Sequence, residues 1–313
     1  MTPPYGKIRK GERIMNKQEL TSLVAEILSQ MNAPQPQVKG SEYKTVVYNE
    51  DRPADTGSVD DVSQLDLRKL YLVDDPADEK AFRRFKERTP ARLGSGRAGP
   101  RYKTVTMLRF RADHAAAQDA VFSELSEDFG SQNGLVSVQT ECKDKDEYLT
   151  RPDKGRRFDG ENAAKIRSGI TGTPRVQLVI GDGLSSAAIA ANAMDCAKAI
   201  RDGLKVRGID LGQGIYVKYC RVGAGDAVGD ITGCELVCVL VGERPGLVTD
   251  KSMSAYITYK PHTGVSESSR TVVSNIHAQG TPAVEAGAYV AELIEKILQR
   301  KVSGVGLHTE ENL

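Results

Sequence analysis

Apolar residues in the C-terminal half of the chain recur in patterns that predict strands alternating with helices. Val176-Gln-Leu-Val-Ile180 is a short apolar run typical of a buried strand, and the Ala-rich stretch from 184 to about 204 predicts the helix that follows it. Further apolar runs predict strands at 215–222, 236–241 and 255–259. The last predicted element is a helix from about 282 to 301, whose apolar stripe is formed by Val290, Leu293, Ile294, Ile297 and Leu298.

The middle of the chain adds a predicted strand at 104–110 and a predicted helix at 113–125. Strands that alternate with helices in this way indicate an α/β fold. We therefore expect a Rossmann-like sheet covered by helices on both faces, in a core that extends over 65–313.

A narrow apolar stripe near the N-terminus predicts a short amphipathic helix at 16–31. Ala33-Pro34-Gln-Pro36 ends this helix, because a residue before proline avoids the helical region. Residues 32–64 contain few large apolar side chains and are typical of a linker, so 1–64 form a predicted flexible extension. The helix could pack on its own domain or dock into the groove of a partner, and its spacing does not decide between the two.

A basic lead-in opens the predicted core. Nine basic residues and a single acidic one, Glu87, lie between 80 and 103. The centre of this segment, Arg92-Leu-Gly-Ser-Gly-Arg-Ala-Gly-Pro100, predicts an irregular loop with exposed backbone N–H groups. The segment could bind an anion or an acidic partner, or it could be a solvated face balanced by acidic residues elsewhere.

The overall composition excludes two classes of partner. The 313 residues carry 43 Lys and Arg against 42 Asp and Glu, a net charge of +1, whereas a protein that coats nucleic acid needs a large positive excess. No apolar stretch approaches the roughly 18 residues of a membrane-spanning helix, and no signal-peptide pattern follows the N-terminal charges. We expect a cytoplasmic protein that binds neither nucleic acid nor a membrane.

The five cysteines are odd in number and irregularly spaced, as is typical of reduced thiols. Only Cys234 and Cys238 are close in sequence. Four residues along a strand would place their thiols about 13 Å apart, too far to share one metal ion. We therefore expect two buried core thiols and no metal site.

Loops of small and polar residues follow several predicted strands. Because ligands of open α/β sheets bind at the carboxyl ends of the strands, these loops predict a pocket there. The first of them also opens a helix, whose N–H groups could face an anionic ligand, although its Gly-Asp-Gly sequence is more commonly a simple turn. The loops are Gly181-Asp-Gly-Leu-Ser-Ser186, Arg221-Val-Gly-Ala-Gly-Asp226, Gly242-Glu-Arg-Pro-Gly-Leu247 and Ser274-Asn-Ile-His-Ala-Gln-Gly-Thr281.

Common nucleotide-binding and catalytic motifs do not account for this pocket. Ser186 stands where a dinucleotide-binding motif has its third glycine, and the chain contains neither a P-loop nor a G-x-S-x-G sequence. Asn275-Ile-His-Ala-Gln-Gly280 comes within one residue of D-x-H-x-x-G, the signature of proteins whose His replaces the lower base of a corrinoid. Asn275 cannot act as the carboxylate that makes such a His a better metal donor.

Five loop motifs occur together in the chain: Arg97-Ala-Gly-Pro100, Thr150-Arg-Pro-Asp-Lys-Gly-Arg-Arg157, Asp182-Gly-Leu-Ser185, Val241-Gly-Glu-Arg-Pro-Gly-Leu247 and Ser274-Asn-Ile-His277. In this order they resemble the light chain of ethanolamine ammonia-lyase, and the resemblance runs from about 67 to 307.

The resemblance implies an adenosylcobalamin-dependent enzyme that converts ethanolamine to acetaldehyde and ammonia. A separate large subunit is expected to carry the substrate site and the residues that handle the radical. The small subunit is expected to close over the cofactor at the interface and to hold no catalytic residue itself. Because the family keeps dimethylbenzimidazole on cobalt, His277 is not an expected axial ligand.

The cofactor contacts that the resemblance implies for this chain are Val222, Glu243 and Val272. Where the family has Asp-Arg-Thr-Cys, this chain has Ser269-Arg-Thr-Val272, so Val272 can offer apolar contact but no S–H hydrogen bond. Glu243 can accept hydrogen bonds from amide groups at the rim of the corrin.

Two further expectations concern the ion pairing of Glu243 and the lining of the pocket. Without the resemblance, an ion pair between Glu243 and a loop arginine, Arg244 or Arg221, would be the first interpretation. Asp182 and Ser185 are expected to line the same pocket.

The resemblance also suggests a function for 16–31. Such an extension is similar to a packaging peptide of a protein-shelled bacterial microcompartment, so shell proteins are an expected partner and the compartment lumen an expected location. Two alternatives stay open. One is a free-standing α/β enzyme that uses the Gly181 turn and Glu243 as acid or base, and the other is a non-catalytic scaffold associated with the microcompartment.

Overall fold

The computed structural model describes residues 61–89 and 91–309. The predicted helix at 16–31 and almost all of the predicted linker lie outside the described residues. The boundary at residue 64 therefore stays a prediction.

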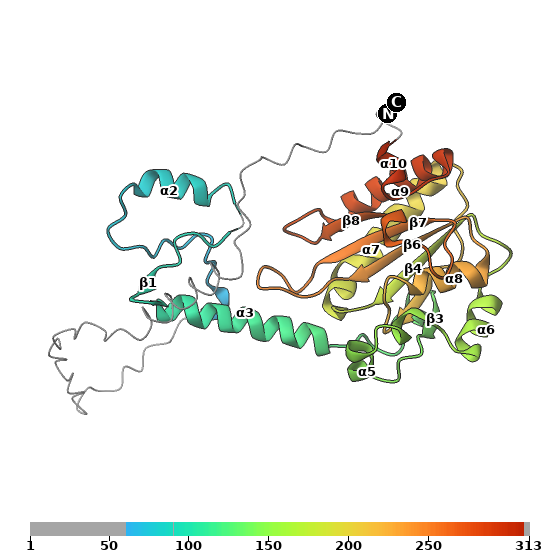
Figure 1. The fold of residues 1–313 in the computed structure, drawn as a ribbon, viewed down its shortest axis with the longest axis horizontal. Coiled ribbons are helices and arrows are strands. Elements are labelled where there is room, and N and C mark those ends of the chain that lie inside the picture. The colour runs from blue at the N-terminus through green and yellow to red at the C-terminus, as the bar shows by residue number, and fades with distance from the viewer. Residues whose placement is uncertain (1–60, 90, 310–313) are drawn as a thin grey trace, which may run out of the picture. The chain divides into compact units, whose positions relative to one another are not determined.

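The core is built on a mixed six-stranded sheet with the strand order β3-β5-β4-β6-β7-β8 (Figure 1). β3, β5, β4 and β6 pair in parallel, whereas β7 is antiparallel to both of its neighbours, β6 and β8. The α/β class predicted from the sequence is confirmed. The strands are β3 (Val136–Gln139), β4 (Val176–Asp182), β5 (Ile215–Lys218), β6 (Leu236–Gly242), β7 (Met253–Tyr259) and β8 (Arg270–Ile276).

Helices cover both faces of this sheet. Every residue of the central strands β4 and β6 is buried, which explains why both appear in the sequence as nearly continuous apolar runs. α7 (Ser186–Val206) and α9 (Ala283–Arg300) pack on one face. α6 (Gly160–Gly169) and α8 (Ala224–Thr232) pack on the other. We call these the α7–α9 face and the α8 face.

The α7–α9 face is a continuous apolar layer. The stripe predicted for the last helix is confirmed, because Val290, Ile294 and Ile297 of α9 are fully buried against the sheet and α7. The helices approach closely, since a Cβ added at Gly287 would stand 2.5 Å from the carbonyl oxygen of Cys196. α9 starts after Pro282 and ends at Lys301, which adopts a left-handed conformation, so both predicted ends are correct to within a residue.

The segment before the sheet differs from the prediction. Residues 104–110 do not form a strand; they are the first turns of α3 (Thr104–Phe122). A short apolar run does not by itself distinguish a strand from a helix, and here Arg109 and Asp113 form an ion pair at the i, i+4 spacing that only a helix provides. α2 (Glu79–Lys86) and a two-residue ribbon of β1 (Arg97–Ala98) and β2 (Arg101–Tyr102) precede α3.

Several other elements were placed wrongly or missed. Gly181 and Asp182 do not form a turn, because β4 continues through both of them. The strand predicted at 215–222 ends at Lys218. The missed elements are α2, β1, β2, β3, β8, α6, α8, α4 (Phe129–Gln132), α5 (Lys145–Thr150), α10 (Gly306–Thr309) and the short 3-10 turns η1 (Val62–Gln64), η2 (Lys154–Arg156) and η3 (Glu267–Ser269).

The cysteine prediction is confirmed as to burial. Cys234 and Cys238 are free, buried thiols, Cys238 within β6 and Cys234 two residues before it. Burial raises the pKa of both thiols, so they stay protonated at neutral pH. None of the helices in the described part of the chain is long and apolar enough to cross a membrane.

Candidate functional site

The three predicted cofactor contacts lie on or beside one face of the sheet. Val222 follows β5 at the start of α8, Glu243 comes directly after β6, and Val272 is the third residue of β8. Residues opposite each other in neighbouring strands point to the same side, and Val239, Tyr256 and Val272 form such a row across β6, β7 and β8. Because Val239 belongs to the core under α8, Val272 points to the α8 face.

Tyr256 is hydrogen-bonded to one of these residues, pairs with the second across the sheet and packs against the same cluster as the third. Its hydroxyl donates a hydrogen bond of 2.8 Å to Oε1 of Glu243. It is the register partner of Val272 in β8, and it packs with Val222 against the same buried cluster. The sequence analysis missed Tyr256. Because β8 was not predicted, the pairing of Val272 in β8 with Tyr256 in β7 could not be predicted either.

This part of the α8 face is open. Val272 is 46 % exposed although it lies in the interior of a strand, whereas Thr271 on the other side of the same strand is buried. The cover supplied by α8 ends at Arg270, whose guanidinium makes two hydrogen bonds of 2.8 Å to the carboxylate of Asp226 in α8. Beyond this ion pair the side chain of Val272 faces outward, and Tyr256 in the neighbouring strand binds the carboxylate of Glu243. Apolar and polar groups together suit a large ligand with both apolar and polar parts.

Among the described residues, Glu243 forms no ion pair with Arg221 or Arg244. The side chain of Arg221 donates instead to the carbonyl oxygen of Tyr148 at 2.7 Å, and its guanidinium lies 4.3 Å from the centre of the Tyr148 ring. Burial, helped by the negative charge of Glu243, raises the pKa of Tyr256, so the phenol keeps its proton and always donates. Within the described residues, Oε2 of Glu243 has no hydrogen-bond partner.

The crevice between the carboxyl ends of β4 and β5 is filled by side chains. β4 is followed by α7 and β5 by α8, so the chain leaves these two adjacent strands toward opposite faces of the sheet. Where adjacent strands diverge in this way, α/β proteins usually bind ligands in an open crevice. Here Nζ of Lys145 donates to the carbonyl oxygen of Gly183 at 3.2 Å, and the hydroxyl of Tyr148 donates to that of Cys220 at 3.1 Å. Both residues belong to α5, which therefore closes the crevice, and burial lowers the pKa of Lys145.

The expectation that Asp182 and Ser185 line a ligand pocket is wrong. Asp182 is only 2 % exposed, and its carboxylate accepts hydrogen bonds from Ser186 at 2.6 Å and Tyr216 at 3.3 Å. Ser185 caps α7, since its hydroxyl oxygen accepts from the backbone N–H of Ala188 and its proton goes to the carbonyl oxygen of Asp250. The N-terminus of α7 is thus satisfied from within the chain.

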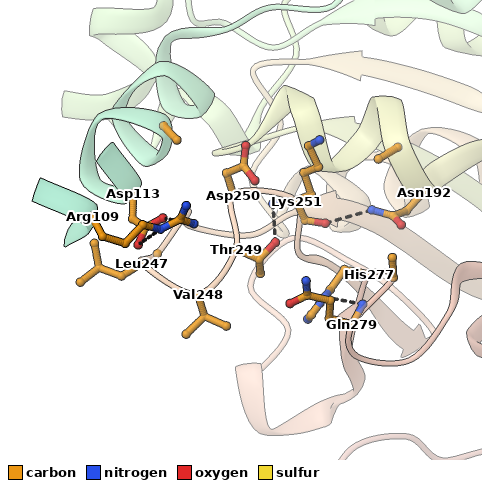
Figure 2. Close-up of a pocket in the computed structure, with 14 residues that line it drawn as sticks. Arg109, Asp113, Asn192, Leu247, Val248, Thr249, Asp250, Lys251, His277 and Gln279 are labelled. Carbon is orange, nitrogen blue, oxygen red and sulfur yellow. Dashed lines mark hydrogen bonds and ion pairs between the residues drawn. The ribbon is translucent and has the colours of Figure 1, made fainter. Parts of the chain in front are cut away.

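A separate cavity of about 540 Å³ borders α7, on the other side of the loop that begins at Glu243. Figure 2 shows that it lies between Arg109 and Asp113 of α3, the loop 246–251 and the loop 277–279. His277 lines it, with Nδ1 accepting from the backbone N–H of Gln279 at 3.3 Å. None of the three predicted cofactor contacts borders this cavity, so it is distinct from the open part of the α8 face.

Part of the basic lead-in is structural. Nζ of Lys86 is buried and donates to the carbonyl oxygens of Leu67 and Leu93 at 2.7 and 2.5 Å. Arg92 shares the carboxylate of Asp113 with Arg109 and also donates to the carbonyl oxygen of Leu247. Arg97, in contrast, is exposed, with its guanidinium 4.9 Å from the centre of the Tyr102 ring.

Comparison with known proteins decides the family. A model of the ethanolamine ammonia-lyase light chain matches residues 79–308, from the first residue of α2 into α10. The chain belongs to the ethanolamine ammonia-lyase light-chain family. It is 53 % identical over 295 residues to the ethanolamine ammonia-lyase small subunit of Clostridium perfringens, which covers 94 % of this chain and 100 % of that protein.

Two further relatives show the same extent of similarity. The ethanolamine ammonia-lyase small subunit of Clostridioides difficile is 53 % identical over 299 residues, with 94 % of this chain and 100 % of that protein covered. That of Listeria monocytogenes is 52 % identical over 295 residues with the same coverage. The light-chain match includes both the α3 segment and the whole sheet, and with them Val222, Glu243 and Val272.

Proposed function

We propose that this chain is the small subunit of an ethanolamine ammonia-lyase and that it completes an adenosylcobalamin site together with a large subunit. The reaction is the conversion of ethanolamine to acetaldehyde and ammonia. The observation that carries the proposal is the light-chain match over 79–308, with high identity to small subunits along nearly the whole chain.

The open part of the α8 face fits a corrinoid. A corrin is a large apolar ring with amide groups at its rim, so its site needs apolar contact and a few hydrogen-bond acceptors. Val272 presents an exposed apolar side chain from the sheet, and Glu243 presents a carboxylate whose Oε2 is unpaired among the described residues. Adenosylcobalamin, when bound, supplies the radical chemistry.

In this proposal the residues of this chain hold and orient the cofactor. Val222 and Val272 contact the ring, and Glu243 accepts hydrogen bonds from amide groups at its rim. Because Val272 replaces the cysteine of the family motif, its contribution is van der Waals contact alone. The sheet is a variant of the Rossmann arrangement in which the site has moved from the filled β4–β5 crevice to the neighbouring β6–β8 surface.

The large subunit supplies the remainder of the site, including the residues that touch the substrate. An open strand surface on the small subunit supports this division, because a corrinoid bound there would still be exposed on its other side. The exposed Arg97 of the basic lead-in is proposed to pack within the complex. Arg97→Glu should weaken assembly with the large subunit, and undiminished co-elution of the two chains would contradict that assignment.

Reconstitution from separate chains tests the proposed function. This chain, the large subunit and adenosylcobalamin are combined in all pairwise and three-way mixtures, and acetaldehyde release from ethanolamine is measured. We expect turnover only when all three are present. A large subunit that turns over equally well alone would favour a non-catalytic scaffold, and activity of this chain alone would favour a free-standing enzyme.

We propose that residues 16–31 direct the complex to the shell proteins of a bacterial microcompartment in the cytoplasm. The apolar stripe of that segment supports the proposal, because it offers one face to a partner groove. Deleting 1–40 should leave turnover unchanged and abolish co-purification with shell proteins. Retention of shell association after the deletion would remove the basis for this assignment.

A further inference from the structure

We infer that Tyr256 is a positioning residue for the cofactor: it fixes the carboxylate of Glu243 so that its second oxygen accepts from the corrin rim. This inference rests on the proposed function. It concerns a residue outside the loop motifs, and it follows from the row of contacts that joins Glu243, Tyr256 and Val272.

A half-buried glutamate needs such a partner to be an ordered acceptor. Glu has three side-chain torsions. If they are free before the ligand binds, fixing them in one geometry on binding costs conformational entropy. The 2.8 Å hydrogen bond from Tyr256 engages Oε1 only. The other oxygen keeps its acceptor capacity, whereas a bidentate arginine would have taken both.

Tyr256 is itself held rigidly. Its backbone is paired on both sides, with Val239 in β6 and with Val272 in β8, and its ring packs against the buried cluster under α8. Arg221, one of the two arginines suggested as a partner of Glu243, donates instead to Tyr148. The position of the Glu243 carboxylate relative to Val272 is therefore set by a single side chain from the strand between them.

The same strand offers a matched control. The hydroxyl of Tyr259, the last residue of β7, also donates to a carboxylate, Oε1 of Glu235, at 3.4 Å, but Tyr259 packs with the α7–α9 core. Tyr259→Phe therefore removes the same atom from the same strand without touching the proposed site.

A double-mutant cycle on the assembled two-subunit complex tests the inference. The dissociation constant of cyanocobalamin is measured by equilibrium dialysis for the wild type, Tyr256→Phe, Glu243→Ala and the double variant, with Tyr259→Phe as control. Tyr256→Phe should raise the dissociation constant about fivefold to tenfold, as expected for loss of one hydrogen bond that orders a charged group. In the Glu243→Ala background the same change should add less than about twofold, because Tyr256 acts through Glu243.

The outcomes separate the inference from the proposed function. If Glu243→Ala weakens binding but Tyr256→Phe does not, the positioning role is wrong and the cofactor site stands. If Glu243→Ala leaves the dissociation constant unchanged, the cofactor site itself is wrong. If the effect of Tyr256→Phe is as large without Glu243 as with it, or is matched by Tyr259→Phe, Tyr256 is a structural residue and the inference is overturned.

Discussion

The two faces of β7 and β8 are made from alternate residues of the same strands, yet they are covered very differently. On the α7–α9 face Met253, Ala255, Ile257 and Ile276 are all fully buried. On the α8 face Val272 of the same strand pair is 46 % exposed. One face is a finished core. The α8 face is also buried at Ser254, Thr258 and Arg270, so the chain leaves only the part around Val272 for something else to cover.

The covers also differ in chemistry. α9 meets the sheet with an apolar stripe, whereas α8 is tied to β8 by the buried ion pair of Asp226 and Arg270. In β8, Arg270 is buried by its ion pair with Asp226 of α8, whereas Val272, two residues further along the same side of the strand, is exposed. The proposed cofactor contact therefore lies on the side of β8 that the helices leave partly open, not on the α7–α9 face.

Removing the ion pair should have the largest effect on stability. Asp226→Ala leaves Arg270 buried without its main partner, and we expect a loss of about 3–5 kcal/mol in the free energy of unfolding. Glu267 contacts the same guanidinium at 2.7 Å but is 68 % exposed, so Glu267→Ala is the matched control and should cost less than about 1 kcal/mol. Equal losses in chemical denaturation would show that burial does not set the strength of this pair.

Truncating one apolar residue on each face compares the faces directly. Ile257→Ala opens a cavity in the finished core and should cost about 2–5 kcal/mol, depending on how far the site relaxes. Val272→Ala removes a side chain that is already half in water and should cost about 0.5 kcal/mol. Similar costs in denaturant titrations would mean that the α8 face is covered in the isolated chain after all.

A pH-dependent prediction follows from Asp182, a buried carboxyl group at the end of β4. Burial raises the pKa of Asp182 above its ordinary value of 3.8. The folded state therefore holds this proton to a higher pH than the unfolded state, and stability is lost as pH rises from about 4 to the folded-state pKa. Asp182→Asn has no such proton, so its stability relative to the wild type should improve over that range. A free energy of unfolding for Asp182→Asn that, relative to the wild type, stays constant or falls as pH rises would contradict the raised pKa.

Sequence patterns predicted the finished face well and the open face poorly. β4, β6 and α9 are buried along a whole run or a whole stripe, so hydrophobicity alone indicates them. β8 mixes buried residues (Arg270, Thr271 and Ile276) with exposed ones (Val272, Ser274 and Asn275), and thus shows no apolar run. The exposed positions of β8, which the proposed site uses, are also the reason that no strand was predicted there.

The site shows the same division. Residue types pointed to four loops, including those with Val222 and Glu243. The first of the four, the Gly181 loop, is closed because α5 fills the crevice with Lys145 and Tyr148. That contact joins segments far apart in sequence and has no local signal. Val222, Glu243 and Val272 came from the family resemblance, and only the register of β7 with β8 adds Tyr256 to them.

The most direct test of the central claim, that the open part of the α8 face contacts the cofactor, is the affinity of the assembled complex for cyanocobalamin when Val272 is replaced by arginine. Val284, at the start of α9, is 60 % exposed and provides the control position. We expect Val272→Arg to leave the small subunit folded and the complex assembled, as judged by size-exclusion chromatography, and to raise the dissociation constant at least about tenfold. Val284→Arg should bind like the wild type. An unchanged dissociation constant for the Val272→Arg complex would contradict the account.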